Sequence, residues 1–166
     1  AARDTNHAHR RSRLMQLGHL PLALSIATYD WNPKTVALTV GMHWLPNADS
    51  LVVKAGWAKP QFHCTVTHTF LFAIVVSALV YLVSPHYAIF TFAAIVAHYA
   101  ADIGSTVGLP LFWPVYDKRL TIALFKDTGY WGWDMIWGYY KQPAAWILEG
   151  AVLAFFVYRL FAIDVL

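Results

Sequence analysis

The stretch from Phe70 to Val83 constrains the fold most, because it contains no charged side chain. A polar segment with two histidines and several threonines, residues 62–69, stands directly before it. Ser84-Pro85-His86 follows, and proline at such a break favours a turn. The apolar residues from Tyr87 to Ala101 then predict a second helix that returns beside the first. The pattern therefore predicts a helical hairpin with a polar entrance.

Composition indicates what surrounds these helices. Hydrophobic residues make up 58% of the 166 residues and charged residues only 13%, whereas soluble domains carry about 25% charged residues. Lipid is therefore the expected solvent, and we expect an all-α protein, a polytopic integral membrane helix bundle with about four to five membrane helices. The net charge of +3 is too small and too scattered for a nucleic-acid surface, so no nucleic-acid partner is expected.

We expect a single membrane domain over residues 1–166. Its parts are a basic N-terminal tail (1–13), motif-bearing helices (14–110), an interfacial aromatic-rich segment (111–142) and a last membrane helix (143–163). Tryptophan and tyrosine favour the membrane–water interface, so the aromatic segment is interpreted as an interfacial belt rather than as a sugar or pigment site. Glu149 and Arg159 inside the last helix predict an intramembrane polar contact or a partner-binding position.

The earlier apolar segments are also expected to be helical. The first runs from Leu14 to about Tyr29. The second, from Thr35 to Leu45, is short because a span needs about 20 residues, so it tilts, stops part-way or borrows interfacial residues. The third is a span that begins near Thr65 or Thr67, either of which is a candidate N-cap, and continues through Val83.

Positive charge in short loops marks the cytoplasmic side of a membrane protein. If the first two segments form one hairpin and the next two form another, the polar connection 46–65 and both basic flanks lie on the same side. That side carries Arg10, Arg11, Arg13, Lys54, Lys59, Lys118, Arg119 and Lys126. The N-terminus is therefore expected in the cytoplasm.

The same topology gathers polar side chains at the cytoplasmic face, although more than 80 positions separate the first from the last. They are His19, Asn47, Asp49, His63, His68, His98 and Asp102. His86 falls at the opposite turn, so we interpret it as an interfacial residue without a role in the site.

His98 and Asp102 are four residues apart, so a helix places both side chains on one face, which Thr106 continues if the helix lasts. Imidazole and carboxylate together suit divalent zinc, iron or manganese. His63 and His68 are about 140° apart on an ideal helix. They can therefore share a site only if His63 lies in the loop and His68 in the first helical turn.

Each of these residues also has a purely structural interpretation. A buried histidine is commonly only hydrogen-bonded, and a bond between His98 and Asp102 would account for that pair. The convergence of the whole set favours a metal site. His43 could support the ligands from behind, with packing as the preferred interpretation, and Cys64 could be a soft ligand, with a small buried thiol preferred.

Three motifs resemble those of the YdjM-like membrane-bound metal-dependent hydrolase family. They are Leu45-Pro46-Asn47-Ala48-Asp49-Ser50, His63-x-x-x-Thr67-His68-Thr69, and His98-x-x-x-Asp102 followed by Gly108. His19 matches an early histidine of that family. The resemblance covers about residues 14–115. It implies a multi-pass protein of the prokaryotic inner (plasma) membrane with a divalent-metal hydrolase site.

Two positions depart from the family's pattern. Asn47 stands where an aspartate is expected, which removes one anionic ligand. Cys64-Thr65 replaces arginine and glycine, which removes a cation able to hold a phosphate. The resemblance therefore implies a site that is less negative than the family's and binds metal more weakly.

Two functions are compatible with these residues. The first is a membrane-bound metal-dependent hydrolase with zinc, manganese or iron at the cytoplasmic membrane face, acting on a lipid or other phosphoester or ester. The alternative is a catalytically degenerate structural or accessory subunit of a larger membrane complex, with other membrane subunits contacting its last helix and aromatic belt. Membrane lipids are expected partners in both. The expected metal ligands are His19, Asp49, His63, His68, His98 and Asp102, of which Asp49, His68 and Asp102 are expected to be catalytic.

Overall fold

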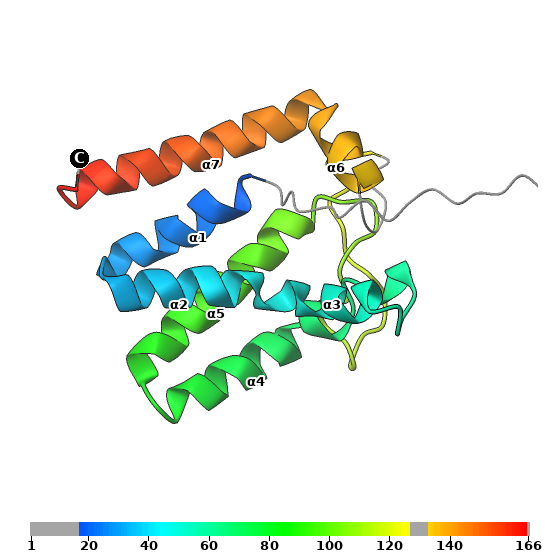
Figure 1. Ribbon diagram of the computed structural model, residues 1–166, viewed down its shortest axis with the longest axis horizontal. Helices are drawn as coiled ribbons and strands as arrows, with labels where there is room; N and C mark the ends of the chain where they lie inside the picture. Colours follow the sequence, from blue (N-terminus) through cyan, green and yellow to red (C-terminus); the bar gives the residue numbers. More distant parts are fainter. Residues whose placement is uncertain (1–16, 127–132, 166) are drawn as a thin grey trace, which may run out of the picture.

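The computed structural model describes residues 17–126 and 133–165, and within them the chain is helical (Figure 1). The predicted all-α class is therefore confirmed for this part of the chain. The basic tail, with Arg10, Arg11 and Arg13, and residues 127–132 of the aromatic segment lie outside the described residues. The helices are α1 His19–Ala27, α2 Pro33–Trp44, α3 Asp49–Lys54, α4 Phe70–Tyr81, α5 Pro85–Asp102, α6 Trp133–Tyr140 and α7 Pro143–Ala162.

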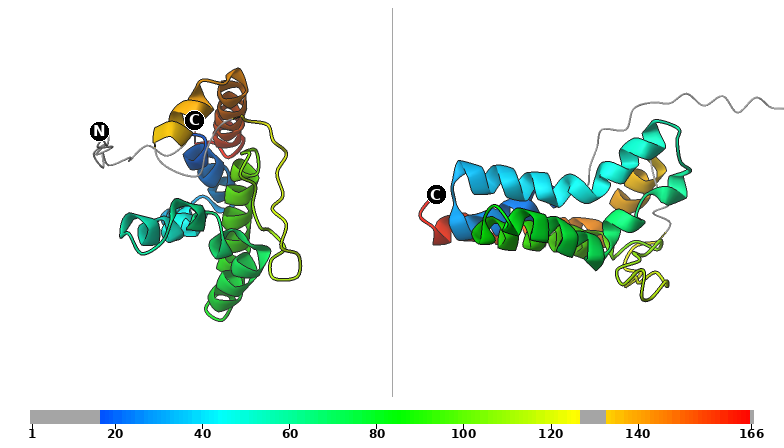
Figure 2. Two further views of the ribbon diagram at one scale, coloured as in Figure 1. Left: turned by 90° about the vertical axis from the view of Figure 1, so that its right-hand side faces the viewer. Right: turned by 90° about the horizontal axis from the view of Figure 1, so that it is seen from below.

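Helix α5 is the scaffold of the fold, because α1, α2 and α4 all pack against it (Figure 2). Its buried face combines small side chains, Ala88 and Ala94, with the larger Ile95 and Tyr99. The alanines leave room for close approach of neighbouring helices, and the larger side chains fill the remaining space. Helix α7 lies outside this group and packs against α1.

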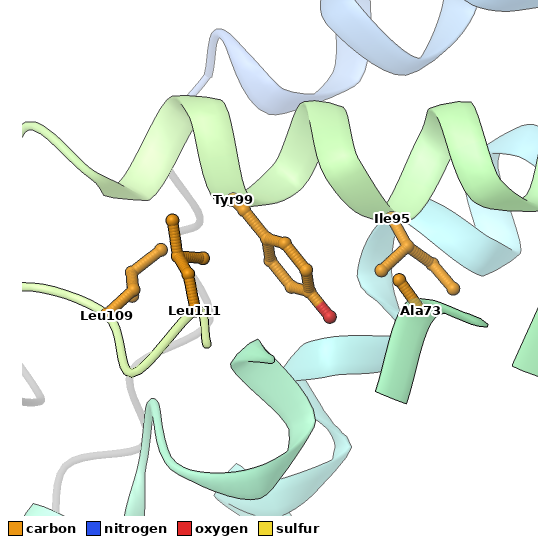
Figure 3. Close-up of a cluster of buried hydrophobic side chains, with 5 residues drawn as sticks. All are labelled: Ala73, Ile95, Tyr99, Leu109 and Leu111. Atoms are coloured by element: carbon orange, nitrogen blue, oxygen red, sulfur yellow. The ribbon is translucent and has the colours of Figure 1, made fainter. Parts of the chain in front are cut away.

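Tyr99 connects the core to the polar segment before α4. Its hydroxyl lies 2.8 Å from the carbonyl oxygen of Thr67 and 3.0 Å from that of Thr69, so it donates to this backbone. The ring belongs to a buried cluster that joins α4, α5 and the segment after α5 (Figure 3). The members of that cluster are Ala73, Ile95, Tyr99, Leu109 and Leu111.

Polar side chains determine where the hairpin helices begin. Asn32 accepts hydrogen bonds of 3.0 Å from the backbone N–H groups of Lys34 and Thr35 at the start of α2. Ser84 caps α5, and Pro85 occupies its first turn, where the missing N–H of proline leaves no bond unmade. The predicted turn at Ser84-Pro85 and the returning helix are therefore confirmed.

The N-cap of α4 is Thr69, so the predicted cap at Thr65 or Thr67 is wrong. Thr69 accepts a hydrogen bond of 3.1 Å from the N–H of Phe72. Residues Val66–His68 form a separate 3₁₀ turn before it, and the Thr67 hydroxyl donates to Asp49 instead. Helix α4 is consequently shorter than the segment predicted to run through Val83.

Other predicted segments differ in extent. In the described part of the first apolar segment, the α-helix covers His19–Ala27 and a 3₁₀ turn follows at Thr28–Asp30. The polar connection 46–65 contains α3, and 3₁₀ turns at Leu45–Ala48 and Pro60–Phe62 lie around it. Helix α5 ends at Asp102, so Thr106 does not continue its face.

Helix α7 is, among the described residues, the one helix long and apolar enough to cross a membrane. It has 20 residues and coincides with the predicted last helix. Helix α4, another predicted span, has only 12 residues. At 1.5 Å per residue such a helix spans about 18 Å, less than the roughly 30 Å hydrocarbon core of a bilayer. The predicted four to five crossings therefore stay a prediction.

Two polar contacts involve α7. The Tyr140 hydroxyl donates to Oε1 of Glu149 at 2.9 Å. The Nε of Arg159 donates to Oγ1 of Thr28 at 3.0 Å, and its guanidinium lies 4.1 Å from the ring centre of Tyr29. Glu149 and Arg159 therefore each make a polar contact. That these contacts lie inside a membrane, like a partner-binding role, stays a prediction.

The segment after α5 folds back beneath Tyr99. Gly108 has a φ of 68°, a left-handed conformation that favours glycine, and a Cβ there would lie 2.9 Å from the carbonyl oxygen of Leu120. Leu109 and Leu120 exchange backbone hydrogen bonds of 2.8 and 2.9 Å. This turn places Leu109 in the buried cluster and closes the end of the fold that carries the histidines.

Candidate metal centre

Five parts of the chain bring ionisable side chains to one end of the helices. Helix α1 supplies His19, α2 supplies His43, α3 supplies Asp49, the segment before α4 supplies His63 and His68, and the last turns of α5 supply His98 and Asp102. The histidines and Asp49 are buried. Water is largely excluded, so each of these polar groups needs a partner inside the protein.

Asp102 faces three imidazoles. Its Oδ2 lies 3.0 Å from Nε2 of His98 and 3.6 Å from Nε2 of His68. Its Oδ1 lies 3.3 Å from Nε2 of His19. The His68 and His98 Nε2 atoms are themselves 3.3 Å apart. The predicted i, i+4 pair of His98 and Asp102 is therefore in contact, and two further histidines share its carboxylate.

Asp49 organises the segment that precedes α4. Its Oδ1 accepts from Nδ1 of His63 at 2.7 Å, and its Oδ2 accepts from the Cys64 N–H at 3.0 Å and from the Thr67 hydroxyl at 2.9 Å. Burial alone would raise the pKa of Asp49, but the bond and charge of His63, the charge of His68 and the Thr67 bond lower it. Asp49 is therefore an ionised carboxylate inside the fold.

Hydrogen-bond partners determine the histidine tautomers at the α1–α2 side. The carbonyl oxygen of Ala94 can only accept, so Nδ1 of His43, 3.0 Å away, donates to it. In neutral His43 the Nε2 atom is then an acceptor, and Nδ1 of His19 donates to it at 2.9 Å. Nε2 of a neutral His19 is consequently an acceptor that faces the acceptor oxygen of Asp102.

The same logic applies to His68. The Thr67 hydroxyl gives its proton to Asp49, so its oxygen accepts from Nδ1 of His68 at 3.0 Å. Nε2 of a neutral His68 is then an acceptor that points towards His98 and Asp102. His98 interacts through Nε2, because its buried Nδ1 has no hydrogen-bond partner among the described residues.

Acceptor atoms thus converge on Asp102, and convergence of acceptors requires positive charge between them. One proton could join His98 to Asp102, but it would leave Nε2 of a neutral His68 still facing acceptors. A divalent cation serves them together. Ligands of a tetrahedral zinc ion, bound at 2.0–2.1 Å, lie about 3.3–3.4 Å apart. The triangle of His68 Nε2, His98 Nε2 and Asp102 Oδ2 has sides of 3.3, 3.6 and 3.0 Å, so these residues fit such an ion.

Cys64 also lies within reach of the centre. It forms a group with His68 and Asp102 whose ligand atoms are all within 4.8 Å of one another. Its φ of 59° is unusual for a residue with a side chain. Burial and the charges of Asp102 and Asp49 raise the pKa of the thiol well above its usual range. Cys64 is therefore a neutral thiol beside the centre, and a soft fourth ligand only if an ion displaces its proton.

The six predicted ligands all lie in this cluster, and His86 lies at the other end of α5, as predicted. Asn47 belongs to the 3₁₀ turn before α3 and is half-buried. His43 was the residue that sequence reasoning undervalued, since its preferred interpretation was packing. Thr35, Thr39 and His43 form a buried polar stripe with a spacing of four residues along α2, and that spacing could have indicated it.

Comparison with known families agrees with the motifs. Residues 16–164 match the family described as YdjM inner membrane protein. The chain belongs to this family. Neither the curated proteins nor the solved structures compared with the chain gave a match. The predicted resemblance is confirmed, and the family supports the predicted inner-membrane location.

Proposed function

We propose that this member of the YdjM inner membrane protein family is a membrane-bound hydrolase that uses a divalent metal ion. The ion is held by His68, His98 and Asp102, with His19 as the neighbouring nitrogen ligand. The observation that carries the proposal is the triangle of two imidazole nitrogens and one carboxylate oxygen, whose sides match the spacing of metal ligands. Nitrogen and oxygen donors of this kind suit zinc, manganese or iron.

The surrounding residues prepare this centre. When bound, a divalent ion lowers the pKa of a bound water towards neutrality and polarises the scissile bond of an ester or phosphoester. Asp49 fixes the tautomer and orientation of His68 through Thr67, as outer carboxylates do for metal-bound histidines. His63 donates to Asp49 through Nδ1 and so helps to hold this carboxylate in place. The proposed catalytic roles thus include those expected for Asp49, His68 and Asp102.

We also propose that the helices cross or enter the inner membrane several times, with the centre at the cytoplasmic face. Helices α4 and α5 expose apolar side chains, among them Ile74, Leu79, Ile89 and Phe92, which lipid would cover. The end of α3 and the loops near the centre contain the cations Lys54, Lys59, Lys118, Arg119 and Lys126. Positive loops favour the cytoplasmic side.

Elemental analysis of the purified protein tests the proposal first. The chain is purified in mild detergent from cells supplied with zinc, manganese and iron, and metal per chain is measured after dialysis. We expect about one ion per chain, its loss in His68→Gln and its retention in the matched variant His86→Gln. Wild-type protein without bound metal would overturn the proposal. Metal-loaded protein is then assayed for ester and phosphoester hydrolysis, with His68→Gln as the inactive control.

A second candidate function is an accessory subunit of a membrane complex. It is favoured by α7, which is barely buried and exposes Trp146, Ile147, Leu153, Phe155 and Phe161. The substitutions at Asn47 and Cys64-Thr65 also fit a chain that lost catalysis. Size-exclusion chromatography after mild solubilisation decides between the candidates, because a chain that always migrates alone contradicts the accessory role.

A further inference from the structure

Helices α1 and α7 enclose a groove of about 410 Å³ on the side of α1 that faces away from the histidines. The two helices lie side by side, and both begin at the end of the molecule that carries the candidate centre (Figure 1). The volume falls in the range of about 300–1,000 Å³ that small-molecule sites occupy. Its walls are Leu17, Gly18, Leu20, Pro21, Leu24, Trp146, Glu149, Gly150, Leu153 and Phe156.

The groove is polar at one end and apolar along its length. Glu149 and the Tyr140 hydroxyl meet at the end near the start of α1, where the Leu17 N–H also donates to Tyr140 at 2.7 Å. Beyond this end, the walls are aliphatic or aromatic as far as Leu24 and Phe156. A ligand with a polar head and a hydrocarbon tail has the same distribution of polarity.

The polar end of the groove lies beside the candidate centre. Gly18 is part of the wall, and the next residue, His19, contacts Asp102. A Cβ at Gly18 would lie 3.1 Å from Cγ of Glu149 on α7. A side chain at position 18 would therefore meet Glu149 at the polar end of the groove.

We propose that the groove holds one acyl chain of a membrane phospholipid, so that an acylated lipid is the substrate class of the proposed hydrolase. This inference rests on the proposed function. The family places the chain at the inner membrane, and α7 leaves most of its apolar surface uncovered by the rest of the chain, so the lipid of the bilayer reaches the open side of the groove. An acyl chain that lies between α1 and α7 brings the ester or phosphate at its head to the end where His19 and Asp102 lie.

Photo-crosslinking tests whether the groove is occupied. Full-length protein is placed in vesicles of phosphatidylethanolamine and phosphatidylglycerol that contain a trace of phosphatidylethanolamine with a diazirine-bearing acyl chain. Adducts are located by peptide mass spectrometry. We expect more adducts on Leu20, Leu24 and Leu153 than on the exposed α4 residues Ile74 and Leu79. Equal labelling of both surfaces is the result expected for ordinary surrounding lipid, and it would overturn the proposal. Absence of adducts in the groove, as when a second copy of the chain covers it, would also overturn the proposal.

Two glycine variants make the test specific. Gly150 lines the groove and Gly41 lies on α2, and an added Cβ meets no atom within 4 Å at either position. Both changes to leucine also favour the helix in the same way. Gly150→Leu should fill the groove and abolish the excess of groove adducts, whereas Gly41→Leu should leave it. Unchanged labelling in Gly150→Leu contradicts acyl binding in the groove.

Metal content and product release separate this inference from the proposed function. Gly150→Leu should retain the wild-type amount of metal but lose the release of fatty acid or head group from the same vesicles, measured by mass spectrometry. Equal product release by Gly150→Leu and wild type overturns the substrate assignment while leaving the hydrolase standing. A wild-type protein without metal overturns the hydrolase, and the substrate assignment with it, whatever the labelling shows.

Discussion

A histidine–aspartate pair lies near each end of α5, and the two pairs have opposite surroundings. Near its start, Nε2 of His86 lies 2.7 Å from Oδ2 of Asp30, and the two side chains are 56% and 34% exposed. At the other end, Nδ1 of His63 lies 2.7 Å from Oδ1 of Asp49, and the side chains are 7% and 2% exposed. Equal distances therefore accompany very different burial.

The difference indicates which pair is a site. Water can solvate His86 and Asp30 whether or not they meet, so their contact requires no further explanation. Burial of charged groups is unfavourable unless their hydrogen-bonding capacity is used. At the buried end Asp49 bonds with backbone and side-chain donors, and acceptors of other histidines converge on Asp102. The exposed pair therefore provides a matched control for every substitution at the buried end.

The largest expected effect is that of Asp102→Asn. The change removes the anionic ligand that contacts three imidazoles. We expect metal affinity to fall by more than about 100-fold, since loss of an outer partner of a ligand already weakens binding by roughly 10–100-fold. Isothermal titration calorimetry of chelator-treated protein with zinc measures this affinity. Asp30→Asn should bind zinc like the wild type, and equal affinities in all three proteins would place the ion elsewhere.

Asp49→Asn should have a smaller effect on the same measurement. The amide retains an acceptor oxygen but loses the charge that holds the His63, Cys64 and Thr67 donors. We expect zinc affinity to fall by roughly 10–100-fold, as for an outer carboxylate behind a ligating histidine. An effect as large as that of Asp102→Asn would instead indicate that Asp49 is itself a ligand.

His43→Leu tests the hydrogen bonds that join His19, His43 and the Ala94 carbonyl. The quantity compared is the stability of the metal-free protein. The change leaves the Ala94 carbonyl and Nδ1 of His19 without their bonds to His43. We expect the free energy of unfolding to fall by about 1–3 kcal/mol, measured by denaturation of chelator-treated protein in mixed micelles. His86→Leu should cause no measurable change, and equal stability of both variants would contradict a structural role for the His43 bonds.

The smallest expected effect is the pH dependence of the stability that the exposed pair, His86 and Asp30, contributes. The hydrogen bond from His86, with those from Thr35 and Asn32, lowers the pKa of Asp30 below its ordinary value of 3.8. A lowered folded-state pKa stabilises the fold above pH 3.8, and this contribution disappears as the pH falls through the lower folded value. The stability difference between wild type and Asp30→Asn should therefore be present at pH 6 and vanish in strong acid. A stability difference that grows as the pH falls would mean that folding raises the pKa of Asp30 instead of lowering it.

The sequence predicted features that depend on neighbouring residues. The spacing of His98 and Asp102, the turn at Ser84-Pro85 and the last helix follow from local rules for helix faces and helix starts. The cap at Thr69 was missed because three threonines compete within five positions, and Asp49, distant in sequence, decides the role of Thr67. The role of His43 and the groove depend on contacts between separate helices, so no local pattern contains them.

The hydroxyl of Tyr99 has a consequence for how the proposed centre acquires its metal. It ties the backbone on both sides of His68 to the core, while Thr67 and Asp49 hold the imidazole from behind. Contacts within the chain thus hold the ligand loop, and we expect one ion to replace another without refolding. With nitrogen and oxygen donors that accept zinc, manganese and iron alike, the metal found in the cell would follow its supply. The same chain could then carry different metals as growth conditions change.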